Sequence, residues 1–263
     1  MFAYKSKFIF KNFKENIKFK KNHKTLSTDI TKNYEYFLFY FYKFSNRFVQ
    51  KHRLYFSKSK RGFGEDAFSS MWEYLFRTYR PKNILEIGVY RGQTLSLFQI
   101  LSNLYLIDSK IYGITPLDFS GDSVSEYIDI DYLEDIKKNF NFFKLNDPNI
   151  LKEYSTSKKS VDFINSINWD LIYIDGSHDY KVVIKDFENS FKNLNNNGLL
   201  IIDDSSLYLN YDSEFIKKKY GINTFIGHPG PSKVVLNIKN QNTLKHLFGV
   251  GHNNVFQKVN DYN

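Results

Sequence analysis

Two stretches of the chain determine its predicted fold: Trp169-Asp170-Leu171-Ile172-Tyr173-Ile174-Asp175-Gly176-Ser177-His178 and Gly198-Leu199-Leu200-Ile201-Ile202-Asp203-Asp204. Each is a short apolar run that ends in a carboxylate. Apolar runs cut off by Asp and Gly are typical of parallel strands that are buried on both faces. Because ligands of open α/β sheets bind at the carboxyl ends of the strands, we expect Asp175, Asp203 and Asp204 to meet at one edge, with His178 close by.

The expected cluster of acidic side chains indicates a bound cation. Carboxylates that lie close together repel one another, and oxygen-only ligands favour Mg²⁺, Mn²⁺ or Ca²⁺. The alternative is that Asp175 and Asp203 only cap helices or lie in polar loops. The Asp203-Asp204 pair and the spacing Asp175-x-x-His178 favour a metal-assisted site, in which His178 could take a proton at neutral pH. Taken alone, a histidine at this position is more often structural.

The composition limits the class of protein. The chain has 263 residues, 42% of them hydrophobic, so we expect one α/β domain with an additional segment. The absence of cysteine excludes disulfides, zinc–thiolate sites and cysteine nucleophiles. The net charge of +9 is uneven, since residues 1–61 hold 16 Lys and Arg against 3 Asp and Glu, whereas the remainder holds 21 against 25. The basic excess therefore lies in an N-terminal arm.

This arm, residues 1–60, is expected to be basic, aromatic and partly helical, with aromatic residues at helical spacing over 34–56. Its charge suggests an anionic surface or partner, but a solvated helical extension fits equally well. The aromatic spacing favours packing on the core or a homo-oligomer over contact with the membrane interface. The longest apolar run is too short to span a membrane, and the start does not resemble a signal peptide. We therefore expect a cytoplasmic protein, with peripheral contact at the inner face of the membrane left open.

The remainder, residues 61–263, alternates strand and helix patterns, which predicts an α/β protein with a mostly parallel sheet and helices on both faces. The expected strands lie at 84–87, 111–115, 150–154, 171–175, 199–203, 222–226 and 234–238. The last two flank a turn rich in Gly and Pro, so we expect the seventh strand to be antiparallel. The tail after residue 238 is polar and rich in Asn.

A turn with two glycines follows the first expected strand, in Ile84-Leu85-Glu86-Ile87-Gly88-Val89-Tyr90-Arg91-Gly92-Gln93-Thr94-Leu95. Gly88 and Gly92 would let the backbone approach a ligand closely. The helix that begins after them would offer free N–H groups to a carboxylate or phosphate. The third glycine of a dinucleotide fingerprint is absent. The next strand ends at Thr115, and Asp118 follows it as a carboxylate that could hold ribose hydroxyls.

The chain resembles a known family over about residues 61–240. Leu85-Glu86-Ile87-Gly88-Val89-x-x-Gly92-x-Thr94 resembles the first motif of class I S-adenosylmethionine-dependent methyltransferases. The segment 170–186, followed by 198–204, is more specific. It resembles the macrocin-type, metal-dependent O-methyltransferases that act on sugar hydroxyls, and the cephalosporin-hydroxylase-like proteins. The resemblance implies a Rossmann-like domain with S-adenosylmethionine and Mg²⁺ or Mn²⁺ as cofactors.

The resemblance also implies a role for each motif residue. The cofactor would contact the glycine turn, the end of the second strand and the residue after the third, which are Glu86, Gly88, Tyr90, Arg91, Gly92, Thr94, Thr115, Asp118 and Ser155. Asp175, Asp203 and Asp204 would hold the metal, and His178 would act as general base beside Asp175. The family usually has an acidic residue where this chain has Thr115, and Asp118 is proposed as its substitute.

The leading hypothesis is a metal-assisted O-methyltransferase for a hydroxyl of a sugar, glycan or related small molecule. Positioning does most of the work in methyl transfer, and a divalent ion lowers the pKa of the hydroxyl. One alternative is a nucleic-acid methyltransferase that uses the basic arm, but the expected site is acidic, which disfavours phosphate. Another is a non-catalytic module that docks on a membrane or a partner through the arm.

Overall fold

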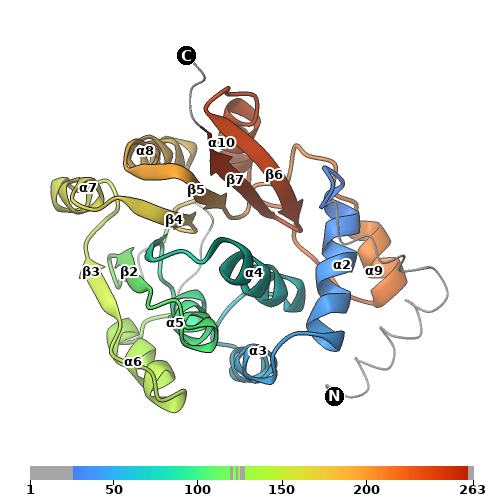
Figure 1. Ribbon diagram of the computed structural model, residues 1–263, viewed down its shortest axis with the longest axis horizontal. Coiled ribbons are helices and arrows are strands. Elements are labelled where there is room, and N and C mark those ends of the chain that lie inside the picture. Colours follow the sequence, from blue (N-terminus) through green and yellow to red (C-terminus); the bar gives the residue numbers. More distant parts are fainter. Residues whose placement is uncertain (1–25, 119–120, 123, 125–127, 260–263) are drawn as a thin grey trace.

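A computed structural model describes residues 26–118, 121–122, 124 and 128–259, and it is built on one seven-stranded sheet (Figure 1). The strand order is β3-β2-β1-β4-β5-β7-β6. β7 runs antiparallel to both of its neighbours, and the pairs among β1 to β5 are parallel. The predicted class, a mostly parallel sheet with one antiparallel strand, is confirmed. The strands are β1 (Asn83–Ile87), β2 (Lys110–Thr115), β3 (Asn149–Lys152), β4 (Trp169–Ile174), β5 (Leu194–Ile202), β6 (Leu244–Val250) and β7 (Asn253–Lys258).

Helices cover both faces of the sheet, because every central strand is apolar on both sides. In β4, Leu171 and Tyr173 join one core cluster, whereas Ile172 and Ile174 join the other. The first cluster is covered by α4 (Asp66–Tyr79), α5 (Gln93–Tyr105) and α6 (Tyr132–Phe142). The second is covered by α7 (Lys158–Asn165), α8 (Tyr180–Lys192) and α10 (Pro229–Ile238). This is the layered arrangement that the sequence predicts.

The N-terminal segment forms two helices that pack on the first core cluster. α2 (Ile30–Lys43) is capped by the Asp29 side chain, and α3 (Arg47–Ser59) by Asn46, which separates the single helical pattern expected at 34–56 into two. α2 lies against α4, β6 and α9 (Ser213–Tyr220). Phe37 and Phe41 of α2 are fully buried there. Residues 1–25 of the predicted arm lie outside the described residues, and a domain boundary at residue 60 stays a prediction.

The C-terminal part differs from the expectation in three places. Residues 222–226 form no strand, residues 234–238 belong to the helix α10, and the tail supplies the strands β6 and β7. Pro229 stands in the first turn of α10, where a missing N–H costs nothing, and Val234, Val235 and Ile238 face the second core cluster at helical spacing. The β-branched pair Val234-Val235 favours a strand locally, but this packing outweighs that preference. Across the described parts of the chain, no helix is long and apolar enough to span a membrane.

Candidate active site

A cavity of about 1180 Å³ opens at the carboxyl ends of β1, β2, β4 and β5. Backbone hydrogen bonds continue past the strand ends, with Asp175 N donating to Ile87 O at 2.8 Å and Asp203 N donating to Ile174 O at 3.0 Å. The strand tips are therefore held side by side, as expected from a parallel sheet. The cavity is lined by every site residue named from the sequence except Gly92.

The glycine turn after β1 lies against the tip of β4. Gly88 has φ of +98°, and a Cβ atom placed on it would lie 2.1 Å from the Asp175 carbonyl oxygen. Gly88 is thus required for the contact between the two strand tips. Gly92, with φ of +74°, is the N-cap of α5, and a Cβ on it would press against Ile136 of α6. Packing against α6 therefore explains why position 92 is a glycine.

Glu86 is the most deeply buried carboxylate of the cofactor side. It stands near the end of β1 and is 3% exposed. Glu86 lines the cavity, and its Oε2 atom is buried without a hydrogen-bond partner among the described residues. Burial, together with the charge of Asp203, raises the pKa of Glu86 well above its ordinary value. An unpartnered buried acceptor of this kind fits a ligand that brings a hydrogen-bond donor or a positive charge.

The side chains that follow Gly88 are held by contacts with neighbouring elements. Tyr90 packs between Phe63 and Tyr132, with ring centroids 5.4 Å and 5.6 Å away. Arg91 Nε lies 2.6 Å from Asp135 Oδ2, and this hydrogen bond raises the pKa of Arg91. These contacts fix the turn over the cavity. Thr94 stands in the first turn of α5 and also lines the cavity, where the N-terminus of that helix offers free N–H groups.

The opposite side of the cofactor region is formed by the ends of β2 and β3. Thr115 is buried at the end of β2, and its hydroxyl accepts from Leu117 N at 3.4 Å. Asp118 follows in the loop, is exposed and lines the cavity. Ser155 lines the cavity after β3. Asp186 of α8 is buried, its carboxyl oxygens have no hydrogen-bond partner among the described residues, and burial raises its pKa to about 7.

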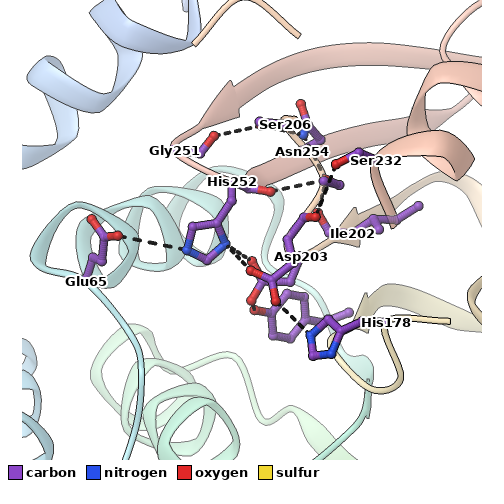
Figure 2. A network of polar contacts seen from close by, with 12 residues as sticks. Glu65, His178, Ile202, Asp203, Ser206, Ser232, Gly251, His252 and Asn254 are labelled. Atoms are coloured by element: carbon purple, nitrogen blue, oxygen red, sulfur yellow. Dashed lines mark hydrogen bonds and ion pairs between the residues drawn. The ribbon is translucent and has the colours of Figure 1, made fainter. Parts of the chain in front are cut away.

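Two aspartates at the tip of β5 form the centre of the acidic side (Figure 2). His252 Nδ1 lies 2.7 Å from Asp203 Oδ1 and 3.0 Å from Asp204 Oδ1. The Tyr173 hydroxyl donates to Asp203 Oδ2 at 2.8 Å. Burial alone would raise the pKa of Asp204, but hydrogen bonds from His178 and His252 hold it well below its ordinary value. The two histidines therefore hold Asp204 in its ionised form.

His178 lies between two carboxylates. Its Nε2 is 2.8 Å from Asp204 Oδ2, and its Nδ1 is 2.8 Å from Asp122 Oδ2. Burial disfavours the charged imidazole, but the hydrogen bonds and charges of Asp204 and Asp122 outweigh it and raise the pKa of His178. The side chain is 15% exposed, so it is oriented by these partners and still reaches the cavity. His228 stacks beside it, with ring centroids 4.3 Å apart.

Asp175 touches the acidic centre from the tip of β4. Burial raises its pKa well above the ordinary value, and the charge of Asp203 adds to the shift. Within the described chain, two groups of metal-ligating atoms lie within 4.8 Å of one another: Asp203, Asp204 and His252 form one, and His178, Asp204 and His228 form the other. Asp175 belongs to neither group, so the ligand set expected from the sequence is brought together only in part.

Several residues of the cavity were not expected from the sequence. Glu65, which precedes α4, and His252, in the turn between β6 and β7, face each other across the acidic side. Asp122 lies in a loop whose polar pattern carried no signal. A Gly-His pair between two apolar runs is a weak indication of a turn at His252, but we expected the whole segment after residue 238 to be a polar tail. The helices α2 and α3 also contribute to the lining, through Tyr34, Leu38 and Arg53.

The charges around the cavity disfavour an anionic polymer. Nine carboxylates line it against three arginines, which are Arg53, Arg61 and Arg91. Each arginine is paired, Arg53 with Asp66 at 3.3 Å and the other two with Asp135. The cavity is therefore acidic, as expected from the sequence.

Comparison with known proteins places this site on a known fold. Residues 85–205 match a family model described as a methyltransferase domain. A second match is the uncharacterized protein R132 of Acanthamoeba polyphaga mimivirus, which is 29% identical over 142 residues. That match covers 52% of this chain and 58% of the mimivirus protein, so the chain spans little more than half the length of this relative.

Solved structures share the architecture at low sequence identity. An O-methyltransferase from Bacillus cereus in complex with SAH is 13% identical with a TM-score of 0.54, over 88% of this chain and 98% of that one. The SAH-bound Podospora anserina methyltransferase PaMTH1 is 15% identical with a TM-score of 0.54, over 84% and 93%. The methyltransferase MycE of the mycinamycin pathway, in complex with Mg, SAH and mycinamycin VI, is 17% identical with a TM-score of 0.50, over 81% and 55%. The chain therefore has a Rossmann-like methyltransferase fold.

Proposed function

We propose that this protein is an S-adenosylmethionine-dependent O-methyltransferase that acts on a hydroxyl of a sugar, glycan or related small molecule with the help of a divalent cation. One observation carries the proposal: the glycine turn with the unpartnered Glu86 and the cluster of Asp203, Asp204 and His178 share a single cavity. A donor of methyl groups and an acceptor can therefore meet there. The macrocin-type resemblance and the acidic lining favour a neutral, polyhydroxylated acceptor.

The cofactor would lie along the ends of β1, β2 and β3. Glu86 would accept from the ammonium group of its methionine part, and the N-terminus of α5 with Thr94 would hold its carboxylate. Thr115 and Asp118 would face the ribose, and Ser155 the adenine. Positioning of this kind supplies most of the rate enhancement in a displacement at a sulfonium methyl group.

The acceptor would bind on the acidic side. The cofactor, when bound, would supply a sulfonium methyl group, which the hydroxyl oxygen would take as the carbon–sulfur bond breaks, and the hydroxyl proton would pass to a base of this chain. His178 is the candidate base, because Asp122 holds its Nδ1 and its Nε2 contacts Asp204 on the acidic side of the cavity. Asp175, Asp203 and Asp204 would hold a divalent ion, which lowers the pKa of a coordinated hydroxyl.

Methyl transfer to vicinal-diol acceptors tests the proposal. Purified protein is incubated with labelled S-adenosylmethionine and a set of methyl glycosides, with and without EDTA. We expect label in the sugar, loss of transfer in EDTA and recovery on addition of excess divalent ion. An Asp203→Ala, Asp204→Ala double variant should be inactive, whereas Asp162→Ala, on the exposed surface of α7, should keep full activity. Full transfer in EDTA or in the double variant would refute the metal role.

A further inference from the structure

The acidic side of the cavity contains a nitrogen ligand in addition to its oxygens. His252 Nδ1 lies 2.7 Å from Asp203 Oδ1 and 3.0 Å from Asp204 Oδ1. One ligand atom from each of the three residues lies within 4.8 Å of the other two. Because their separations are short and all three atoms carry lone pairs, a single cation at this point would contact all three.

The other nitrogen of His252 has a carboxylate partner. His252 Nε2 lies 3.9 Å from Glu65 Oε1 (Figure 2). Glu65 in turn accepts a hydrogen bond from the Tyr34 hydroxyl. Histidines that bind metals almost always direct their second ring nitrogen at a carboxylate or carbonyl, which fixes the ring and the tautomer. His252 has this environment, with Nδ1 directed at the two aspartates and Nε2 at Glu65.

Hydrogen bonds join the backbone around His252 to the loop that follows the two aspartates. Ser205 N donates to His252 O at 2.9 Å, and the Ser206 hydroxyl donates to Gly251 O at 2.8 Å. Asn254 Nδ2 donates to both serine hydroxyls, at 2.9 Å and 3.0 Å. The imidazole and the two carboxylates are thus parts of one rigid frame, which is what a metal site of defined geometry needs.

An independent feature indicates that the cavity takes a positively charged group next to this frame. Glu86 lines the same cavity, and its buried Oε2 atom has no hydrogen-bond partner among the described residues. A buried carboxylate oxygen left in this state is costly unless a ligand satisfies it. Nine carboxylates line the cavity, against three histidines and three arginines, so the lining has an excess of acidic groups.

We propose that His252 is a metal ligand through Nδ1, together with Asp203 and Asp204, and that the site binds a first-row transition ion in preference to Mg²⁺. The inference rests on the metal role in the proposed function and specifies its ligands. Mg²⁺ selects oxygen ligands and binds imidazole poorly, whereas imidazole suits Mn²⁺, Fe²⁺, Co²⁺ and Zn²⁺ increasingly well. A ligand set of two carboxylates and one imidazole therefore shifts the preference away from Mg²⁺.

Electron paramagnetic resonance with Mn²⁺ as the probe tests this inference without any methyl acceptor. Free and bound Mn²⁺ are counted in a titration of the full chain, and Mg²⁺ is then added as competitor. We expect Mn²⁺ to bind at least about tenfold more tightly than Mg²⁺. Pulsed measurements on the bound Mn²⁺ should show the ¹⁴N modulation of a directly coordinated imidazole.

Three variants locate that nitrogen. His252→Gln should abolish the ¹⁴N modulation and reduce the preference for Mn²⁺ over Mg²⁺. His246→Gln is the matched control, because it changes a histidine of the same hairpin that bonds Asn254 at 3.0 Å and lies outside both metal-ligating groups. It should keep the modulation. Glu65→Gln should keep the modulation too, but weaken Mn²⁺ binding about tenfold or more through the loss of the carboxylate behind the ring.

The outcomes separate this inference from the proposed function. Tight Mn²⁺ binding without ¹⁴N modulation in the wild-type protein would overturn the role of His252, whether or not the variants fold, and leave an oxygen-only site. Modulation that disappears in His178→Gln and persists in His252→Gln would overturn it too, by moving the ion to the other group. Coordination by His252 in a protein that methylates no diol would instead refute the proposed function and leave the metal assignment standing.

Discussion

The backbone of Gly88 lies so close to that of Asp175 that any side chain on Gly88 would overlap it, since a Cβ atom there would lie 2.1 Å from the Asp175 carbonyl oxygen. Gly88→Ala should therefore push the tips of β1 and β4 apart and lower the free energy of unfolding by at least about 2 kcal/mol. Urea unfolding measures this loss. Gly221→Ala is the matched control, because Gly221 also has positive φ but nothing within 4 Å, so it should lose only about 1 kcal/mol. Equal losses at the two positions would contradict the contact.

Glu86→Gln should separate stability from cofactor binding. The buried carboxyl has a raised pKa, so its charged form makes the folded state less stable as pH rises above the ordinary value of 4.5. The variant should unfold at pH 7 at a urea concentration equal to or higher than the wild-type protein, but bind S-adenosylmethionine about tenfold more weakly in equilibrium dialysis.

Glu73→Gln is the control for that prediction, since Glu73 is equally buried but has partners. It accepts from Asn46 N at 3.1 Å and from the Tyr105 hydroxyl at 2.5 Å. It should lose stability and keep its affinity for S-adenosylmethionine. A Glu86 variant that behaves like the Glu73 variant would show that Glu86 is structural.

His178→Gln should lower kcat about 10²- to 10⁴-fold and leave the KM for S-adenosylmethionine unchanged, if His178 takes the acceptor proton. A base is active when neutral, so kcat should rise with pH through its pKa, which Asp204 and Asp122 hold above 6.5. Asp122→Asn removes one negative charge and should move this rise of kcat to lower pH. If kcat rises at the same pH in Asp122→Asn, or still rises with pH in His178→Gln, the base is another group.

His52 should make the protein sensitive to acid. It is fully buried in α3, its Nε2 lies 2.9 Å from the Ser96 hydroxyl, and burial lowers its pKa to about 3. Between pH 6.5 and pH 3 the unfolded chain binds a proton at His52 that the folded chain does not bind, so stability falls as pH falls, by up to about 1.4 kcal/mol per unit. His52→Gln should flatten the difference in urea midpoint between pH 7 and pH 5. An unchanged difference would mean that His52 is protonated when folded.

Phe37 tests whether α2 belongs to the core. Phe37→Ala should cost about 3–5 kcal/mol, because its fully buried ring packs on Phe248 of β6 and on Tyr74 of α4. Phe44→Ala, which changes a ring that is 57% exposed at the end of α2, should cost less than about 1 kcal/mol. Similar small losses at both positions would mean that α2 is only loosely attached.

The parts of the fold that could be predicted are those where local pattern and packing agree. β1, β4 and β5 are apolar on both faces and end in Gly or Asp, so the sequence alone indicated where their carboxylates would meet. In α10, the strand preference of Val234-Val235 disagrees with the packing against α8, and the packing determines the outcome. A sequence carries no direct signal of such a long-range contact.

The part of the site that the sequence concealed depends on residues distant along the chain. Glu65 and His252 are unremarkable in their own segments, and only the hairpin of β6 and β7 brings them together. Asp203 and Asp204 were identified because two adjacent carboxylates after an apolar run form a local pattern. The imidazole of His252, which binds them, has only the weak signal of a Gly-His pair, because Lys245 and His246 interrupt the apolar run of β6.

The position of β7 has a consequence for how the acidic centre assembles. β7 inserts between β5 and β6 although it follows both along the chain, and His252 precedes it directly. The imidazole of His252 therefore reaches Asp203 and Asp204 only when the hairpin of β6 and β7 is docked on β5. A folding species without that docked hairpin would carry the glycine turn but not the complete acidic centre.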